Sequence, residues 1–367
     1  MIDDALLASR EIPTSLRDAR AFLIRHRSRD MHGRATESTG LVITPTSADA
    51  DMPVLTWCHG TTGLGDAACP SAQPDPAREF LPYFTIEATQ QIDYGVPGAQ
   101  AFLDAGWVLC ATDYQGLGTP GLHQYTLNRT NARDAVNIVH AAHRMGLRLS
   151  HQVAAMGWSQ GGAAAAAVAE LDANDFGPLE LIGVVPMSPG VPDIALTLPS
   201  GTFIEALFDP TKAPDSHLFM ILAAMGSTFA EFSLDDVFTP LGKQILAGTA
   251  DTQPVHHLND TLARLHLTRG PILQFDQSKF DALLAAMSSA SAGQARPRCP
   301  VLVCIDGFAG GTAVPVVWQQ QYAKQVTALG GDITTTIYPD DDHFSLPASC
   351  VTDARRWLEE RLTTVTL

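Results

Sequence analysis

The chain has 367 residues, of which 46% are apolar and 17% are charged, so it can bury a core in one large domain or two ordinary ones. Its net charge of −16 is spread along the chain. This argues against nucleic acid or an anionic membrane as a partner, because both require clustered Lys and Arg. No apolar run reaches the roughly 18 residues of a membrane-spanning helix, so we expect no stable membrane insertion.

The N-terminus reads MIDDALLASREIPTSL and has acidic residues where a secretory leader carries Lys or Arg. We therefore expect a cytoplasmic protein, or alternatively a secreted protein whose leader has been removed. Of the six cysteines, Cys58, Cys110 and Cys304 fall in apolar runs and are predicted to be buried thiols. Cys69 and Cys299 lie in turn-like sequence and are candidates for a disulfide, while no Cys/His spacing indicates a metal site.

Short apolar runs typical of strands alternate with helical patterns along most of the chain. The predicted strands are 40–44, 54–58, 107–112, 153–156, 181–187, 301–305 and 332–338, and the helical patterns between them include 131–145 and 316–329. Strands that alternate with helices predict an α/β fold with a mostly parallel sheet covered on both faces.

Strand patterns fade from about residue 192 to residue 297. Most of the apolar segments in this stretch predict short helices: 203–207, 218–225, 229–232, 241–246, 258–267 and 280–287. We expect an inserted helical cap or lid at 192–297, on a core formed by residues 1–191 and 298–367. The alternative is that these helices simply extend the outer layer of the core.

A strand, a sharp turn and a helix of small residues are predicted around Ser159. The segment Gly157-Trp158-Ser159-Gln160-Gly161 has the form G-x-S-x-G, and an Ala-rich run follows it. In α/β-hydrolases this turn lifts a nucleophilic hydroxyl above the sheet, and side chains two residues to either side would collide with neighbouring backbone. Ser159 is therefore the predicted nucleophile, and a Gly/Ser loop that merely joins strand to helix is the alternative.

The predicted strand 54–58 leads into His59-Gly60-Thr61. A backbone amide at this point and the amide after the nucleophile together bind the oxyanion in such folds. We expect Thr61 and Gln160 to supply these two amides. His59 comes too early for the chain order Ser, acid, His, so we interpret it as a side chain that braces the loop.

His343 is the predicted base, since Ser159 requires one to become a strong nucleophile. It follows the strand 332–338 and an acidic loop, and it precedes a final helix predicted at about 347–362. The competing histidines are His256 and His257 in the predicted cap, and His140 and His143 on a helix.

Asp306 is the predicted acid of the triad. It is the only carboxylate in the loop after strand 301–305, where it can orient and charge-stabilise the imidazole. A turn-forming Asp-Gly pair is the alternative interpretation. The rival acids are Asp341 and Asp342 beside His343, and Asp193 after strand 181–187.

In combination these motifs resemble the secretory lipase family, which includes lipase A-like fungal enzymes and many actinobacterial members. The segments that carry the resemblance are 57–71, 112–119, 157–162, 314–315 and 342–344. The resemblance runs from about Arg27 to the C-terminus. It implies an α/β-hydrolase core with a helical cap, hydrolysis of carboxylic esters, and no cofactor. Family members usually place the acid in a G-x-x-D-x-x-V-P turn, and that position here is Gly311.

The predicted function is that of a serine carboxylesterase or lipase, of the EC 3.1.1 type, acting on hydrophobic acyl or aryl esters through an acyl-enzyme. Its partner is a small-molecule ester, with no metal and no cofactor, and no oligomeric state follows from the sequence. The alternatives are an acyltransferase or a peptidase with the same triad. A catalytically inactive binding protein, suggested by Gly311, is the third.

Overall fold

The computed structural model describes residues 5–48, 50–198, 204–231, 233–308 and 313–362. Within them one sheet has the strand order β1-β2-β3-β5-β4-β6-β7-β8-β9. The strands are β1 (Leu6–Ile12), β2 (Ala19–Arg29), β3 (Ala35–Pro45), β4 (Met52–Cys58), β5 (Val108–Thr112), β6 (Leu149–Trp158), β7 (Glu180–Met187), β8 (Val301–Asp306) and β9 (Ile333–Tyr338). The first three pairs in this order are antiparallel and all later pairs are parallel. The predicted mostly parallel sheet is confirmed.

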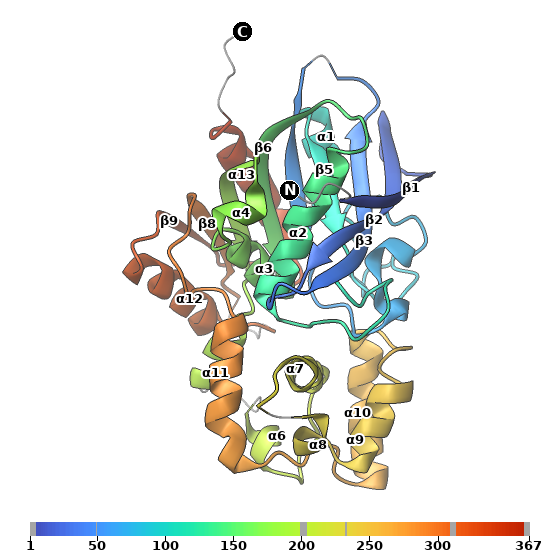
Figure 1. Cartoon of the computed structure of the whole chain (residues 1–367), viewed down its shortest axis with the longest axis vertical. Helices are drawn as coiled ribbons and strands as arrows, with labels where there is room; N and C mark the ends of the chain where they lie inside the picture. Colours follow the sequence, from blue (N-terminus) through green and yellow to red (C-terminus); the bar gives the residue numbers. More distant parts are fainter. Residues whose placement is uncertain (1–4, 49, 199–203, 232, 309–312, 363–367) are drawn as a thin grey trace.

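Helices cover both faces of the sheet (Figure 1). One face carries α2 (Asn128–Ala142), α3 (Gln160–Val168) and α12 (Val316–Ala328), with α4 (Ala173–Phe176) beside them, and the other carries α1 (Ala99–Asp104) and α13 (Leu346–Glu359). The helix α3 is built almost entirely from Ala and Gly, and every one of its residues is buried. Small side chains let this helix lie close to the sheet, which fixes the position of the turn that precedes it.

The insertion between β7 and β8 is helical, as predicted. It contains α5 (Pro192–Thr197), α6 (Glu205–Phe208), α7 (Ser216–Thr228), α8 (Leu234–Val237), α9 (Pro240–Gly248), α10 (Val255–Arg269), the 3₁₀ turn η3 (Gln277–Lys279) and α11 (Phe280–Ala290). From α6 to α11 these helices gather at one end of the sheet and share an apolar cluster centred on α7 (Figure 1). We call this group of helices the cap.

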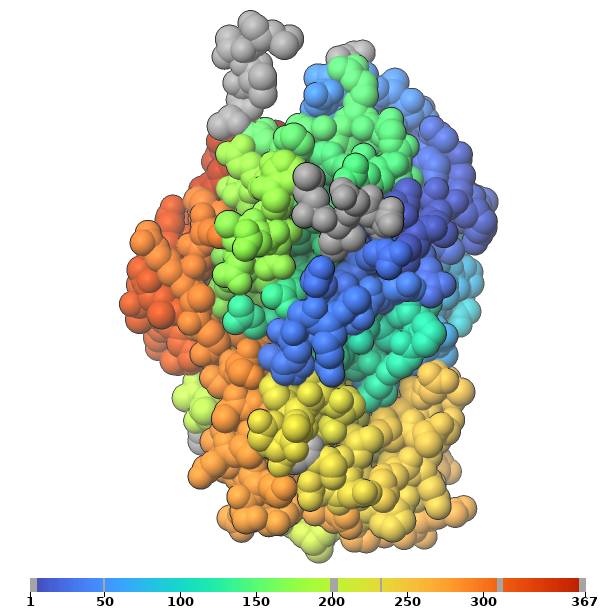
Figure 2. All heavy atoms as spheres, in the orientation of Figure 1, coloured from blue at the N-terminus to red at the C-terminus, as the bar shows by residue number. Residues whose placement is uncertain are grey.

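The cap packs directly against the core. The Val255 amide at the start of α10 donates to the Thr62 carbonyl at 2.8 Å, and Gly63 forms an antiparallel bridge with Pro254. On another side the His32 and Phe229 rings meet edge to face at 5.7 Å. In Figure 2 the tip of the β2–β3 hairpin, in blue, lies against the yellow cap segment. The cap therefore rests on the loop that follows β4.

Several local predictions differ from the structure. The hairpin β1–β2 and the helix α1 were not predicted. In the second half of β2, exposed arginines alternate with buried polar side chains, so this half carries no apolar run. The segment 229–232 was predicted to be helical, but Phe229 is the extended residue that ends α7. Residue 232 lies outside the described residues.

The disulfide suggested for Cys69 and Cys299 is wrong. Both are buried free thiols. Cys69 packs in a small cluster under the loops that follow β4, whereas Cys299 belongs to the core cluster near α12. Burial raises the pKa of both thiols, and neither is a reactive thiolate. In the described part of the chain, no helix is both long and apolar enough to cross a membrane.

Candidate active site

Ser159 occupies a strained turn between the central strand β6 and the helix α3. Its φ is +59° and its ψ is −118°, a conformation that a residue with a side chain adopts only when its surroundings enforce it. A Cβ at Gly157 would overlap the Gly161 carbonyl, and a Cβ at Gly161 would overlap the Cys58 carbonyl. The two glycines therefore permit the close backbone approach that holds Ser159 at the end of the sheet.

Gln160 is the first residue of α3, where the amides of a helix are unpaired and the helix dipole favours negative charge. Its side-chain amide donates to His123 Nε2 at 2.9 Å, and His123 Nδ1 lies 2.9 Å from the Gln115 carbonyl. Burial lowers the pKa of His123 to about 3, so the ring is neutral. Its Nδ1–H then donates to Gln115 and its Nε2 accepts from Gln160, which anchors the Gln160 side chain.

Thr61 lies in the loop after β4, and its hydroxyl is 2.8 Å from the Tyr125 hydroxyl. His59 braces the same loop, with Nδ1 at 2.6 Å from the Gly60 carbonyl and Nε2 at 3.1 Å from the Asp113 carbonyl. Desolvation lowers the pKa of His59. Because both ring nitrogens face backbone carbonyls, this geometry supports loop bracing over the role of base.

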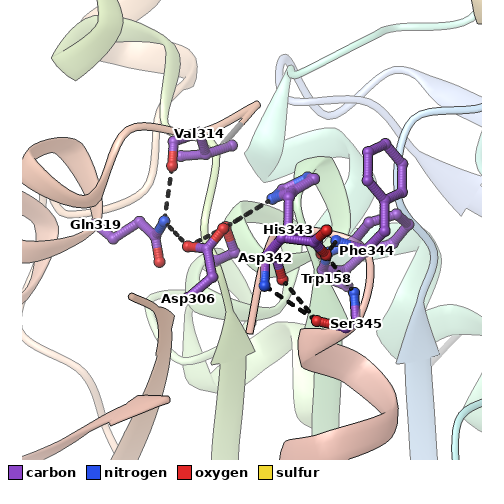
Figure 3. Close-up of polar contacts among 9 residues, drawn as sticks. Trp158, Asp306, Val314, Gln319, Asp342, His343, Phe344 and Ser345 are labelled. Carbon is purple, nitrogen blue, oxygen red and sulfur yellow. Dashed lines mark hydrogen bonds and ion pairs between the residues drawn. The ribbon is translucent and has the colours of Figure 1, made fainter. Parts of the chain in front are cut away.

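His343 lies in the loop between β9 and α13, buried beside the strand that leads to Ser159. The Trp158 indole N–H donates to the His343 carbonyl at 2.8 Å, and the two rings pack with centroids 5.0 Å apart (Figure 3). This contact ties the histidine loop to the residue before Ser159. In the described residues no hydrogen bond joins the Ser159 hydroxyl to His343, and such bonds often tighten only once substrate is bound.

Asp306 is the last residue of β8 and is fully buried. Its Oδ2 forms an ion pair with His343 Nδ1 at 3.7 Å, and its Oδ1 accepts a hydrogen bond from the Gln319 side-chain amide (Figure 3). The same Oδ1 accepts from the Ser188 hydroxyl at 3.3 Å. Gln319 is fixed in turn by the Val314 carbonyl at 2.7 Å. The carboxylate thus lies in a dry polar cluster directed at the imidazole. Gly311 lies outside the described residues.

The rival carboxylates have other partners. Asp342 Oδ1 accepts from the Phe344 and Ser345 amides at 2.9 and 2.8 Å, and so caps the turn before α13. Asp341 accepts from the Ser349 hydroxyl at 2.7 Å, and Asp193 accepts from the Gln294 side chain at 2.8 Å. Of the four candidate acids, Asp306 alone has a recorded contact with the His343 ring in the described residues.

Comparison with known proteins shows what this chain resembles. Residues 85–199 match the family model of the secretory lipases. The predicted family resemblance is confirmed. The secretory lipase match includes Ser159 and Gln160, whereas Thr61, Asp306 and His343 lie outside the matched residues. No curated protein sequence matches the chain.

Several solved structures share the fold of this chain over nearly its whole length. The rice cell wall degrading esterase LipA from Xanthomonas oryzae is 19% identical, with 98% of this chain and 99% of that chain covered at a TM-score of 0.71. A putative hydrolase from Legionella pneumophila is 15% identical, with 99% and 100% covered and a TM-score of 0.68. Candida antarctica lipase A is 14% identical, with 98% and 83% covered at 0.68. The predicted α/β-hydrolase fold with an inserted helical cap is confirmed.

Four residues at the site were not predicted from the sequence. They are the partners of the predicted residues: Ser188 and Gln319 beside Asp306, His123 beside Gln160, and Tyr125 beside Thr61. The run Met187-Ser188-Pro189-Gly190 at the end of β7 carries no motif that marks a functional serine. These contacts arise only because segments that are distant in the sequence pack together in the folded chain.

Proposed function

We propose that the protein is a serine carboxylesterase or lipase in which Ser159 is the nucleophile, His343 the base and Asp306 the acid. The observation that carries this proposal is the strained turn at Ser159, held by two glycines beside the loop of Thr61. The match to the secretory lipases and the likeness to solved esterase and lipase structures support the ester-hydrolase class.

The proposed reaction follows from the placement of these groups. His343 takes the proton of the Ser159 hydroxyl through Nε2, and the serine oxygen attacks the ester carbonyl. The amides of Thr61 and Gln160 hold the negative oxygen that develops, with the N-terminus of α3 adding its dipole. His343 then gives the proton to the leaving alcohol. Water, activated by the same histidine, releases the acid from the acyl-enzyme.

The surroundings of the proposed site exclude water. Ser159, His343 and Asp306 are 8%, 3% and 0% exposed, so the charges that develop during reaction lie in a medium of low dielectric. Fixed dipoles act more strongly there than in water. The cap, seated on the loop of Thr62 and Gly63, contributes to this enclosure.

Aromatic side chains beside His343 favour an apolar substrate. The Phe344 ring lies 5.8 Å from Trp158 and 5.1 Å from Phe84, a half-exposed side chain. Tyr83 stacks at 3.5 Å on His256, which belongs to the cap helix α10. We propose esters with a hydrophobic acyl or aryl group as substrates, since such surfaces gain most from leaving water here.

An alkyl fluorophosphonate tests the nucleophile directly. We expect one covalent adduct per chain, located on Ser159 by peptide mass spectrometry, because the strained turn of a G-x-S-x-G motif is the conformation that exposes a nucleophilic serine in this fold. The matched control is Ser159→Ala, which keeps the backbone turn and removes the oxygen. An unlabelled wild-type protein, or an adduct on another serine, contradicts the proposal.

A series of p-nitrophenyl esters of increasing acyl length tests the proposed substrate class. We expect kcat/KM to rise by up to about fourfold for each added methylene until the apolar site is filled, which is the effect of burying one such group at about 0.8 kcal/mol. Ser159→Ala supplies the background rate for each ester. A profile that is flat or that falls from the acetate onward argues for a small polar acyl group instead.

A further inference from the structure

A buried hydroxyl lies between the proposed base and the proposed acid. Ser188 Oγ is 2.9 Å from His343 Nδ1 and 3.3 Å from Asp306 Oδ1. The direct separation between Nδ1 and Asp306 Oδ2 is 3.7 Å, which is too long for a hydrogen bond. Of these two polar neighbours, the serine oxygen therefore lies nearer to the imidazole Nδ1.

The direction of these two hydrogen bonds follows from their chemistry. A carboxylate only accepts, so the Ser188 O–H donates to Asp306. A hydroxyl has a single hydrogen, so Ser188 Oγ accepts from His343 and the imidazole hydrogen resides on Nδ1. In the neutral imidazole this arrangement leaves Nε2 without a hydrogen, which is the tautomer that a base needs to accept the Ser159 proton.

The backbone holds Ser188 firmly in this position. The residue is fully buried, and its φ of +43° is one that a residue with a side chain seldom adopts. Its amide donates to the Cys304 carbonyl at 2.8 Å, which joins the end of β7 to the strand that ends in Asp306. A strained, buried residue persists only where its surroundings determine it, and such residues gather at functional sites.

We propose that Ser188 is a positioning residue that links Asp306 to His343 and fixes the imidazole tautomer for catalysis. This inference rests on the proposed function of the Ser159 site. The Nδ1 hydrogen stays on His343 throughout, and Ser188 neither gains nor loses a proton. When His343 accepts the Ser159 proton on Nε2, the serine oxygen continues to accept from Nδ1, while the Asp306 charge stabilises the imidazolium.

A double-mutant cycle on kcat/KM separates this role from a structural one. Ser188→Ala keeps the backbone conformation and removes only the hydroxyl. We expect kcat to fall by about 10- to 100-fold while KM stays unchanged. A loss of this size corresponds to one hydrogen bond to a charged group. In an Asp306→Asn background the same substitution should lower kcat by less than about threefold, because the carboxylate that Ser188 links to His343 is already absent. Equal losses in both backgrounds, or a loss below about twofold in the wild type, overturn the proposal.

Ser28→Ala is the matched control. It removes a buried serine hydroxyl on β2, between β1 and β3 in the sheet, and this hydroxyl lies beside another buried carboxylate, Asp134 of α2. We expect Ser28→Ala to change stability but not kcat. Ser188→Cys keeps a weaker donor and acceptor at the same atom and should recover part of the activity lost in Ser188→Ala. A Cys variant no better than Ala counts against the link.

The proton NMR signal of His343 Nδ1–H provides a readout that needs no turnover. We expect a slowly exchanging downfield resonance in the wild type and in Ser28→Ala, and its loss or upfield shift in Ser188→Ala. A resonance unaffected by Ser188→Ala overturns the proposal even if Ser159 is labelled. Conversely, if Ser159 is not labelled but the resonance depends on Ser188, the proposed function is rejected while the contact between Ser188 and His343 is supported.

Discussion

Asp306→Asn should lower kcat by about four orders of magnitude, the scale of losing the acid of a Ser-His-Asp triad. The substitution removes the only negative charge recorded in contact with the His343 ring among the described residues. Gln319 and Ser188 both donate to Oδ1, so an Asn oxygen that keeps these two bonds turns its NH2 group toward His343 Nδ1, where a donor faces another donor. Steady-state kinetics on a p-nitrophenyl ester measures the effect.

The control for this experiment is Asp342→Asn, which neutralises a carboxylate one residue from His343. Asp342 accepts from the Phe344 and Ser345 amides, and an Asn oxygen can accept in the same way. We therefore expect its kcat to stay within a few fold of the wild type. A loss below tenfold for Asp306→Asn would transfer the role of acid to another residue.

Gly161→Ala should abolish most activity and lower the melting temperature. The added methyl would overlap the backbone carbonyls of Cys58 and His59, and neither carbonyl can rotate away. Relief requires α3 and the loop after β4 to move apart, which displaces the amides of Gln160 and Thr61 together. Overpacking of this kind costs about 1–3 kcal/mol or more, and a shift near 1 Å in a catalytic group costs about 100-fold in rate.

Gly248→Ala is the matched control, because it is the same exchange in another helix. Gly248 ends α9, and a Cβ there would meet no atom within 4 Å. Both substitutions gain up to about 1 kcal/mol of helix propensity, so their difference isolates the collision at Gly161. The measurements are the melting temperature and kcat of both variants, compared with those of the wild type. Wild-type behaviour of Gly161→Ala contradicts the proposed close packing at the turn.

The proposed acid shows why the sequence left one position of the site open. The triad order predicted an acid after the strand that ends at 305, and the structure extends this strand to Asp306. The family pattern pointed instead to Gly311. The contacts that favour Asp306 come from Ser188 and Gln319, which are 118 and 13 residues away in the chain. No local pattern relates residues at such separations.

The cap likewise combines helices that local sequence patterns predict with contacts that they do not. Its helices were predicted because apolar residues recur with helical spacing, which is a local property. Its docking on Thr62 and Gly63 depends on a backbone hydrogen bond from Val255, almost two hundred positions along the chain. The contact between His32 and Phe229 likewise depends on the β2–β3 hairpin, whose strand β2 was not predicted.

By itself the sequence determined the turn at Ser159, the place of His343 between the last strand and the last helix, and the alternation of strands and helices. These features depend on residues a few positions apart, where steric limits on the backbone act directly. Only the tertiary structure decided which side chains surround Asp306, which residues anchor Thr61 and Gln160, and that Ser188 lies against His343. Such contacts join strand ends that meet only when the sheet assembles, so their partners are set by folding and not by spacing.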